Sequence, residues 1–251
     1  MPAARIKLLS YNIHKGFSLG RKFVLENIRT AIRSTGTDLV FLQEVLGRHD
    51  RHQRKIPLWP RQSQFEYLAD EVWSHYAYGE NAVYSSGHHG NAILSKYPFT
   101  SQKNVDISVT RFARRGLLHG VIQVPRRKTP VHLICIHLDL RDTDRMLQAE
   151  LLADHIDSHV PKKAPLILAG DFNDWQQKMT RHLVEALQVQ EVFMALHNNH
   201  ARTFPARAPT LKLDRVYFRG FRPVDAQRLH RRPWNRLSDH VPLYAELEFA
   251  K

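Results

Sequence analysis

Apolar residues recur along the chain in short runs bounded by turn residues, a pattern typical of β-strands. Several runs are apolar at consecutive positions, as in Leu39–Leu42 and Leu166–Ala169, so both faces of these strands need cover. The clearest predicted strands are Ile6–Ile13, Asp38–Glu44, Ala92–Ser95, Leu117–Val124, Val131–Leu138, Leu166–Ala169, Arg215–Phe218 and Leu243–Phe249.

Three apolar stripes with helical spacing lie between these strands. Their positions are Val24, Ile28, Ala31 and Ile32; Phe65, Leu68, Ala69, Val72 and Trp73; and Met146, Ala149, Ala153, Ile156 and Val160. Gly36 is placed to end the first helix, and Ser63 with Glu66 forms a capping-box pattern before the second. The stripes predict three amphipathic helices.

The two halves of the chain repeat one order: strand, helix, strand, and then a meander of strands. No linker or low-complexity tract divides them, so we expect a single domain over residues 1–251. Two packed mixed sheets with helices outside each would cover every strand on both faces. The predicted fold is therefore a four-layer α/β/β/α sandwich.

Composition narrows the class of protein. The formal net charge of +13 over 251 residues favours a polyanionic partner such as nucleic acid or an anionic membrane surface. No apolar run approaches the roughly 20 residues that span a bilayer, and the first residues leave no room for a signal peptide. The single cysteine, Cys135, lies in an apolar run and is expected to be a buried thiol. We expect a cytoplasmic monomer.

Polar residues stand at the ends of the predicted strands. Those that follow a strand or end it are Asn12, Glu44, His137, Asp171 and Asn173, and those that precede one are Asp214, Asp239 and His240. By the period of two, Glu44 shares a strand face with Asp38, Val40 and Leu42. The two groups meet at one edge if their strands run antiparallel. Each residue alone has a structural explanation, as a turn residue, a helix cap or a core histidine.

Seven short segments in order carry a resemblance to a known superfamily. They are Ser10–His14, Leu42–Val45, Gly90–Ser95, Ile136–Leu138, Gly170–Asn173, Leu213–Val216 and Ser238–His240. Together they resemble the endonuclease/exonuclease/phosphatase (deoxyribonuclease I-like) superfamily. The resemblance implies the same four-layer sandwich and hydrolysis of phosphate esters with Mg²⁺, for which Mn²⁺ is a possible substitute.

The resemblance also implies a role for each residue. Glu44 would be the principal metal ligand, with Asn12 and Asp239 beside it. Asp171 and Asn173 would orient the attacking water, and Asp171 would accept its proton. Asp214 would pair with His240 and keep the imidazole cationic. Asn91 and Arg115 would bind the substrate phosphate.

His137 distinguishes the branches of the superfamily. It stands where deoxyribonucleases, sphingomyelinases and tyrosyl-DNA phosphodiesterases carry a histidine, and the chain lacks the Tyr-x-Pro-Asn motif of abasic-site endonucleases. We therefore expect the histidine-containing branch. Glu80 is a candidate partner for His137. His88 and His89 should point to opposite sides of a strand and receive no role.

Two basic segments, 47–62 with Trp59 and 228–236 with Trp234, should overhang the site. Arginines interleaved with an aromatic residue suit a nucleic-acid backbone with stacked bases, and suit an anionic phospholipid surface nearly as well. Solvated loops are the plain alternative. We expect a nucleic-acid phosphodiesterase, with a phospholipid phosphodiesterase, a small-molecule phosphatase and a non-catalytic binding module as alternatives.

Overall fold

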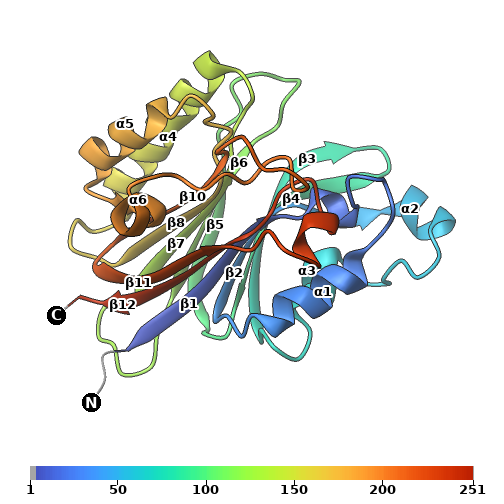
Figure 1. Cartoon of the computed structure of the whole chain (residues 1–251), viewed down its shortest axis with the longest axis horizontal. Coiled ribbons are helices and arrows are strands. Elements are labelled where there is room, and N and C mark those ends of the chain that lie inside the picture. The colour runs from blue at the N-terminus through green and yellow to red at the C-terminus, as the bar shows by residue number, and fades with distance from the viewer. Residues whose placement is uncertain (1–3, 251) are drawn as a thin grey trace.

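The computed structural model describes residues 4–250, which form two six-stranded mixed sheets packed face to face (Figure 1). One sheet has the order β11-β12-β1-β2-β4-β3 and the other β5-β6-β7-β8-β10-β9. The strands are β1 (Arg5–Asn12), β2 (Leu39–His49), β3 (His75–Tyr84), β4 (Gly87–Ser95), β5 (Phe99–Asp106), β6 (Gly116–Ile122), β7 (Val131–His137), β8 (Leu166–Asp171), β9 (Gln190–Glu191), β10 (Asp214–Arg219), β11 (Phe221–Arg228) and β12 (Leu243–Phe249).

Helices cover the outer face of each sheet (Figure 1). They are α1 (Leu25–Ser34), α2 (Asp50–Lys55), α3 (Gln64–Ala69), α4 (Asp142–His159), α5 (Lys178–Leu187) and α6 (Val192–His197), with 3₁₀ turns η1 (His14–Gly16) and η2 (Trp234–Arg236). One buried cluster fills the space between the sheets, a second packs α4 and α5 on their sheet, and a third packs α1 and α3 on the other. The four-layer α/β/β/α sandwich is confirmed.

The repeat between the two halves is visible in the strand pairing. β1 pairs with β2 in parallel after the crossover through α1, and β7 pairs with β8 in parallel after the crossover through α4. The late strands β12 and β10 then pair antiparallel with β1 and β8. Residues that end the early strands therefore meet residues that begin or precede the late ones, as the sequence predicted.

Strands with polar, exposed side chains were not predicted from the sequence. β5 has six exposed residues of eight and lies at a sheet edge, so it carries no apolar pattern. β3 and β11 are also edge strands with few buried positions. The second predicted helix is shorter than its apolar stripe, because Trp73 follows α3 and its indole N–H donates to the carbonyl of Thr37 over 3.2 Å.

Two smaller expectations concern the core and the membrane. Cys135 is buried, and burial raises the pKa of its thiol to about 12, so it acts as a small apolar residue as predicted. No helix among residues 4–250 is long and apolar enough to cross a membrane.

Candidate active site

Strand register places three of the predicted site residues in one row. His137 ends β7, and it lies beside Asp171 at the end of the parallel strand β8. Asp171 in turn lies opposite Asp214, which begins the antiparallel strand β10. All three are buried, and their strands are neighbours in one sheet.

The Asp171 carboxylate is the point on which the site converges. Its Oδ2 atom accepts a hydrogen bond from Asn12 Nδ2 over 3.1 Å. The Nε2 atoms of His137 and His240 each lie 3.6 Å from the same oxygen. The other oxygen, Oδ1, accepts from the backbone N–H of Asn173 over 3.0 Å. Residues from both sheets thus hold one buried carboxylate in a fixed orientation.

Glu44 reaches the site through a break in the pleat of β2. The pairing of β2 with β4 shifts between Leu42 and Val45, and Glu44 has a left-handed backbone with φ of 54°. The predicted period of two from Asp38 to Glu44 is therefore wrong, because the bulge inserts an extra residue and turns the carboxylate away from the face of Leu42. A non-glycine residue with positive φ is strained, and such strain is concentrated at functional sites.

The loop before β12 brings the last two site residues. Ser238 Oγ donates to the backbone carbonyl of Asn12 over 2.7 Å, which ties this loop to the end of β1. Asp239 Oδ1 lies 3.1 Å from Ser238 Oγ and 4.0 Å from His14 Nδ1. His240 Nδ1 lies 2.8 Å from Asp214 Oδ2, so the pair expected from the resemblance is in contact.

These residues surround one cavity of about 410 Å³, here called the catalytic cavity. It is lined by Asn12, Lys15, Glu44, His89, Arg115, His137, Leu140, Asp171, Asn173, Trp175, Phe204, Leu211, Leu213, Asp239 and His240. Asp214 lies behind His240, and Asn91 lies outside the lining.

Burial and neighbouring charges separate the protonation states of the three central groups. Burial alone would lower the pKa of His240, but the carboxylates of Asp214 and Asp171 outweigh it and raise this pKa to about 10. Burial lowers the pKa of His137 well below its usual value, and Arg115 and His240 add to the effect. Burial raises the pKa of Asp171 to about 6, against the opposing effect of His240. Near neutral pH the site therefore holds a cationic His240, a neutral His137 and an ionised Asp171.

Two groups of side chains are candidates for holding a divalent metal. Asp171, Asp214 and His240 offer ligand atoms within 4.8 Å of one another. His240 is already bonded to Asp214, and an imidazolium has no lone pair for a metal. Glu44 and Asp239, which both line the cavity, form the second group: Glu44 Oε1 accepts from Asn12 Nδ2 over 3.5 Å, and the interactions of Asp239 in the described part of the chain use Oδ1. Hard oxygen donors of this kind suit Mg²⁺ or Mn²⁺.

Of the predicted substrate contacts, one lines the cavity and one does not. Arg115 faces the cavity, and its Nε atom lies 3.4 Å from Asp139 Oδ1. The Asn91 amide instead donates to the backbone carbonyls of Gly116 over 2.9 Å and Cys135 over 3.4 Å. These bonds join the two sheets, because Asn91 lies on β4 and its two partners lie on β6 and β7. Asn173 Nδ2 likewise donates to the carbonyl of Leu138 over 2.9 Å.

Two basic residues that the sequence left without a role line the cavity. Lys15, in η1, places Nζ 3.9 Å from Glu44 Oε2. His89 lies on β4, and burial lowers its pKa to about 4. His88 points elsewhere, with Nδ1 3.2 Å from Glu80 Oε2, so the two histidines do face opposite ways. The suggested pairing of Glu80 with His137 is wrong. His89 could have been found by its position two residues before Asn91.

Apolar side chains also line the cavity, and four of them are here called the apolar wall: Leu140, Trp175, Phe204 and Leu211. The basic wall consists of Lys15, His89 and Arg115. Apolar residues at turns gave no periodic signal in the sequence, which is why the apolar wall was missed.

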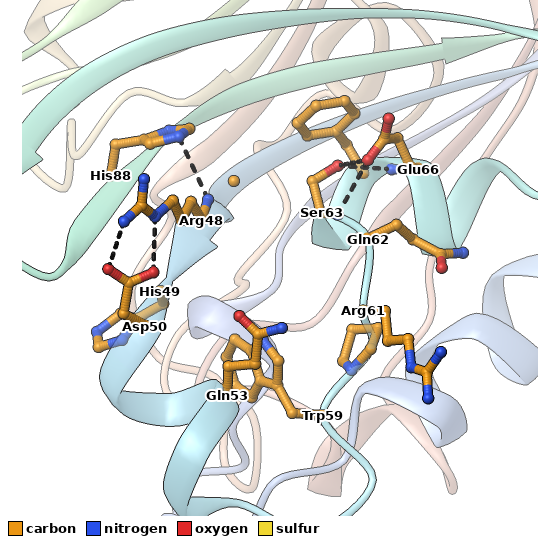
Figure 2. A pocket seen from close by; sticks show the side chains of 13 residues that line it. Arg48, His49, Asp50, Gln53, Trp59, Arg61, Gln62, Ser63, Glu66 and His88 are labelled. Carbon is orange, nitrogen blue, oxygen red and sulfur yellow. Dashed lines mark hydrogen bonds and ion pairs between the residues drawn. The ribbon is translucent and has the colours of Figure 1, made fainter.

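The two basic segments differ from what the sequence suggested. Trp234 is 8% exposed and packs edge-on against Tyr11, with ring centroids 5.7 Å apart, so it belongs to the core and is not free to stack on a base. In the segment 47–62, Trp59 is half-buried and stacks on Phe23 at 4.7 Å. Segment 47–62 surrounds a separate cavity of about 410 Å³, and Figure 2 shows its Arg48 paired to Asp50.

Comparisons with known proteins agree with this fold. The model of the Endonuclease/Exonuclease/phosphatase family matches residues 9–240. The protein YbhP of Escherichia coli (strain K12) is 43% identical over 242 residues, which are 96% of this chain and 95% of that protein. An endonuclease/exonuclease/phosphatase structure from Beutenbergia cavernae DSM 12333 has a TM-score of 0.76 and 19% identity, and covers 98% of this chain and 72% of its own. D. rerio TDP2 complexed with single strand DNA product has a TM-score of 0.71 and 19% identity, with 98% of this chain and 99% of that chain covered. The chain therefore belongs to the endonuclease/exonuclease/phosphatase family.

Proposed function

We propose that this protein is a metal-dependent phosphodiesterase that hydrolyses nucleic acid. Members of its family are generally phosphoester hydrolases, typically dependent on a divalent metal. The observation that carries the proposal is the convergence of Asn12, His137 and His240 on one oxygen of Asp171, in a cavity that the carboxylates of Glu44 and Asp239 also line.

Glu44, Asp239 and Asn12 are the residues that would hold Mg²⁺ or Mn²⁺. A divalent cation there supplies polarisation of the phosphoryl oxygen and stabilisation of the leaving oxyanion. The fit rests on hard oxygen donors that line a shared cavity, where the present neighbour of Glu44 Oε2 is Lys15 Nζ at 3.9 Å.

The remaining residues divide the hydrolysis between them. Asp171 and Asn173 orient a water molecule, whose oxygen bonds to phosphorus as the ester P–O bond breaks, and Asp171 accepts the proton of that water. His240, kept cationic by Asp214, stabilises the negative charge that grows on the phosphoryl oxygens. His137 donates a hydrogen bond as a neutral imidazole, and Arg115 binds the phosphate from the basic wall.

Nucleic acid is supported as the substrate by the charge and by segment 47–62. Arg51, Arg54, Lys55 and Arg61 are exposed and form no ion pair within the described residues, whereas Arg48 is paired. Their positions around Trp59 suit a flexible single strand, as does the resemblance of the fold to the DNA-bound TDP2. A second candidate is an anionic phospholipid, because Leu58 is 96% exposed beside these cations and borders an apolar cavity of about 520 Å³.

A substrate panel with Mg²⁺ or with chelator tests the function. Single-stranded DNA and RNA, phospholipid vesicles and small phosphate monoesters are compared, with Asp171→Asn as the inactive reference. We expect cleavage of a nucleic-acid phosphodiester that chelator abolishes. Binding should fall with salt by a slope of log K against log salt of about −0.7 for each phosphate contacted. Faster cleavage of a phospholipid headgroup would replace nucleic acid by the second candidate, and no hydrolysis of any substrate would contradict the proposal altogether.

A further inference from the structure

The apolar wall raises a question that phosphate chemistry does not answer, because a phosphate needs no apolar contact. Trp175 is 38% exposed, Leu140 62% and Leu211 40%, although all three line the catalytic cavity. Large apolar side chains left open beside a reactive centre cost hydration free energy unless a ligand covers them. These side chains are therefore available to contact an apolar surface of a ligand.

Trp175 is held in place from behind. The guanidinium carbon of Arg145, a fully buried residue of α4, lies 4.5 Å from the centroid of the indole ring. Arg145 donates to the carbonyls of Asp139 and Leu140 and, over 2.8 Å, to Asp142 Oδ1. One face of the indole is thus occupied by an anchored cation, which fixes the ring at the cavity edge.

The loop that carries Trp175 is anchored on its other side as well. Asp174 accepts the backbone N–H groups of Lys178 and Met179, both over 3.1 Å, and its carbonyl accepts from Arg215 over 3.1 Å. The same loop contains Asn173, whose amide is bonded to Leu138. A ring fixed in this way has lost its conformational freedom before a ligand arrives, which favours stacking.

The shape and polarity of the cavity indicate which apolar group fits. The cavity is also lined by the basic wall of Lys15, His89 and Arg115. An acyl chain would need apolar surroundings on all sides, whereas a nucleobase has an apolar face and polar edges. Trp59 stacks on Phe23, and Trp73 and Trp234 are buried, so Trp175 is the tryptophan that the described chain presents to the catalytic cavity.

We propose that Trp175, with Leu140 and Leu211, binds the nucleobase adjacent to the scissile phosphate and makes the enzyme selective for phosphodiesters that carry a base at that position. This inference rests on the proposed function of the same site. Stacking of a base on an aromatic ring is worth on the order of a 5-fold to 100-fold change in affinity. The effect should appear in kcat/KM and only for a substrate that has the base.

Dinucleoside monophosphates test the inference. Three substrates are compared: one with both bases, and two in which one or the other nucleoside is replaced by an abasic sugar. The wild-type enzyme should lose on the order of 10-fold or more in kcat/KM on one of the two abasic substrates. Trp175→Ala should lose as much on the intact substrate and almost nothing further on that abasic one. Circular dichroism and thermal melting check that each variant is folded.

Two conservative variants separate stacking from other roles. Trp175→Phe keeps a planar ring and should retain most of the selectivity, whereas Trp175→Leu keeps an apolar side chain without a ring and should lose it. Equal slowing of intact and abasic substrates by Trp175→Ala would show that the ring only supports the loop, and would overturn the inference. Full activity of Trp175→Leu would indicate an aliphatic ligand and overturn it too. If the folded wild-type enzyme cleaves no dinucleoside monophosphate, the result contradicts the proposed nucleic-acid function, on which the role of Trp175 depends.

Discussion

Three buried histidines form a chain of hydrogen bonds between β6, β7 and α4, away from the catalytic cavity. His119 Nδ1 lies 3.0 Å from His155 Nε2, and His119 Nε2 lies 3.0 Å from His132 Nδ1. Each contact needs one proton, so the chain is satisfied with all three rings neutral. If His132 and His155 were both protonated, both would donate to His119, which cannot accept at both nitrogens.

Burial opposes protonation of these three histidines and makes the stability of the protein depend on pH. Burial, reinforced by the neighbouring histidines, lowers the pKa of His119 to about 3 and that of His155 to about 4, from 6.5 in the unfolded chain. The folded state therefore binds fewer protons than the unfolded state between these values. The stability present above pH 6.5 is lost as the pH falls toward 3. At pH 5 the loss is about 2 kcal/mol for each of the two histidines, since 1.5 pKa units separate pH 5 from 6.5.

His119→Gln removes one titrating ring and retains an amide that can donate and accept. The free energy of unfolding is measured by urea titration with tryptophan fluorescence at pH 8 and pH 5. The difference between the two pH values should be about 2 kcal/mol smaller in His119→Gln than in wild type. His230→Gln, at an exposed position, is the matched control and should leave the difference unchanged. An undiminished difference in His119→Gln would refute the assignment of the pH dependence to the buried chain.

Three further predictions concern the site and its support. Glu44→Gln should lower turnover on the order of 10²-fold and raise the Mg²⁺ concentration that gives half-maximal rate. The control is Glu246→Gln, whose side chain forms an ion pair with Arg5 and which should change neither quantity. Equal metal dependence in the two variants would show that Glu44 is not a metal ligand. Gly170→Ala should destabilise the protein by about 2–4 kcal/mol in urea unfolding, because Gly170 has φ of 153° and an added Cβ would overlap the carbonyl oxygen of the facing β7 strand; wild-type stability would mean that the strands relax. Trp234→Ala should lower the free energy of unfolding by about 3–5 kcal/mol, because it truncates a buried side chain. Unchanged stability together with weaker nucleic-acid binding would instead show that Trp234 contacts the nucleic acid.

The layers of the fold and most residues of the candidate site could be predicted from the sequence alone. Runs such as Leu39–Leu42 need cover on both faces, and two sheets with outer helices supply it. Polar residues at strand termini such as Asp171 and Asp214 could be predicted to meet if their strands ran antiparallel, because the end of one strand and the beginning of its antiparallel neighbour lie at the same edge. The local sequence pattern is sufficient to predict these features, because the spacing of apolar residues along a strand indicates which of its faces are buried.

Other features depend on contacts between distant parts of the chain and could not be predicted from the sequence. The bulge at Glu44 depends on the pairing of β2 with β4, which alternation along one strand does not contain. Trp59 and Trp234 stand in similar basic segments, yet only packing against Tyr11 places Trp234 in the core. Trp175 is held in position by contact with Arg145, which lies on α4, in a separate segment of the chain. Contacts between residues far apart in the chain leave no periodic signal. The apolar wall beside the Asp171 carboxylate could therefore not be predicted from the sequence alone.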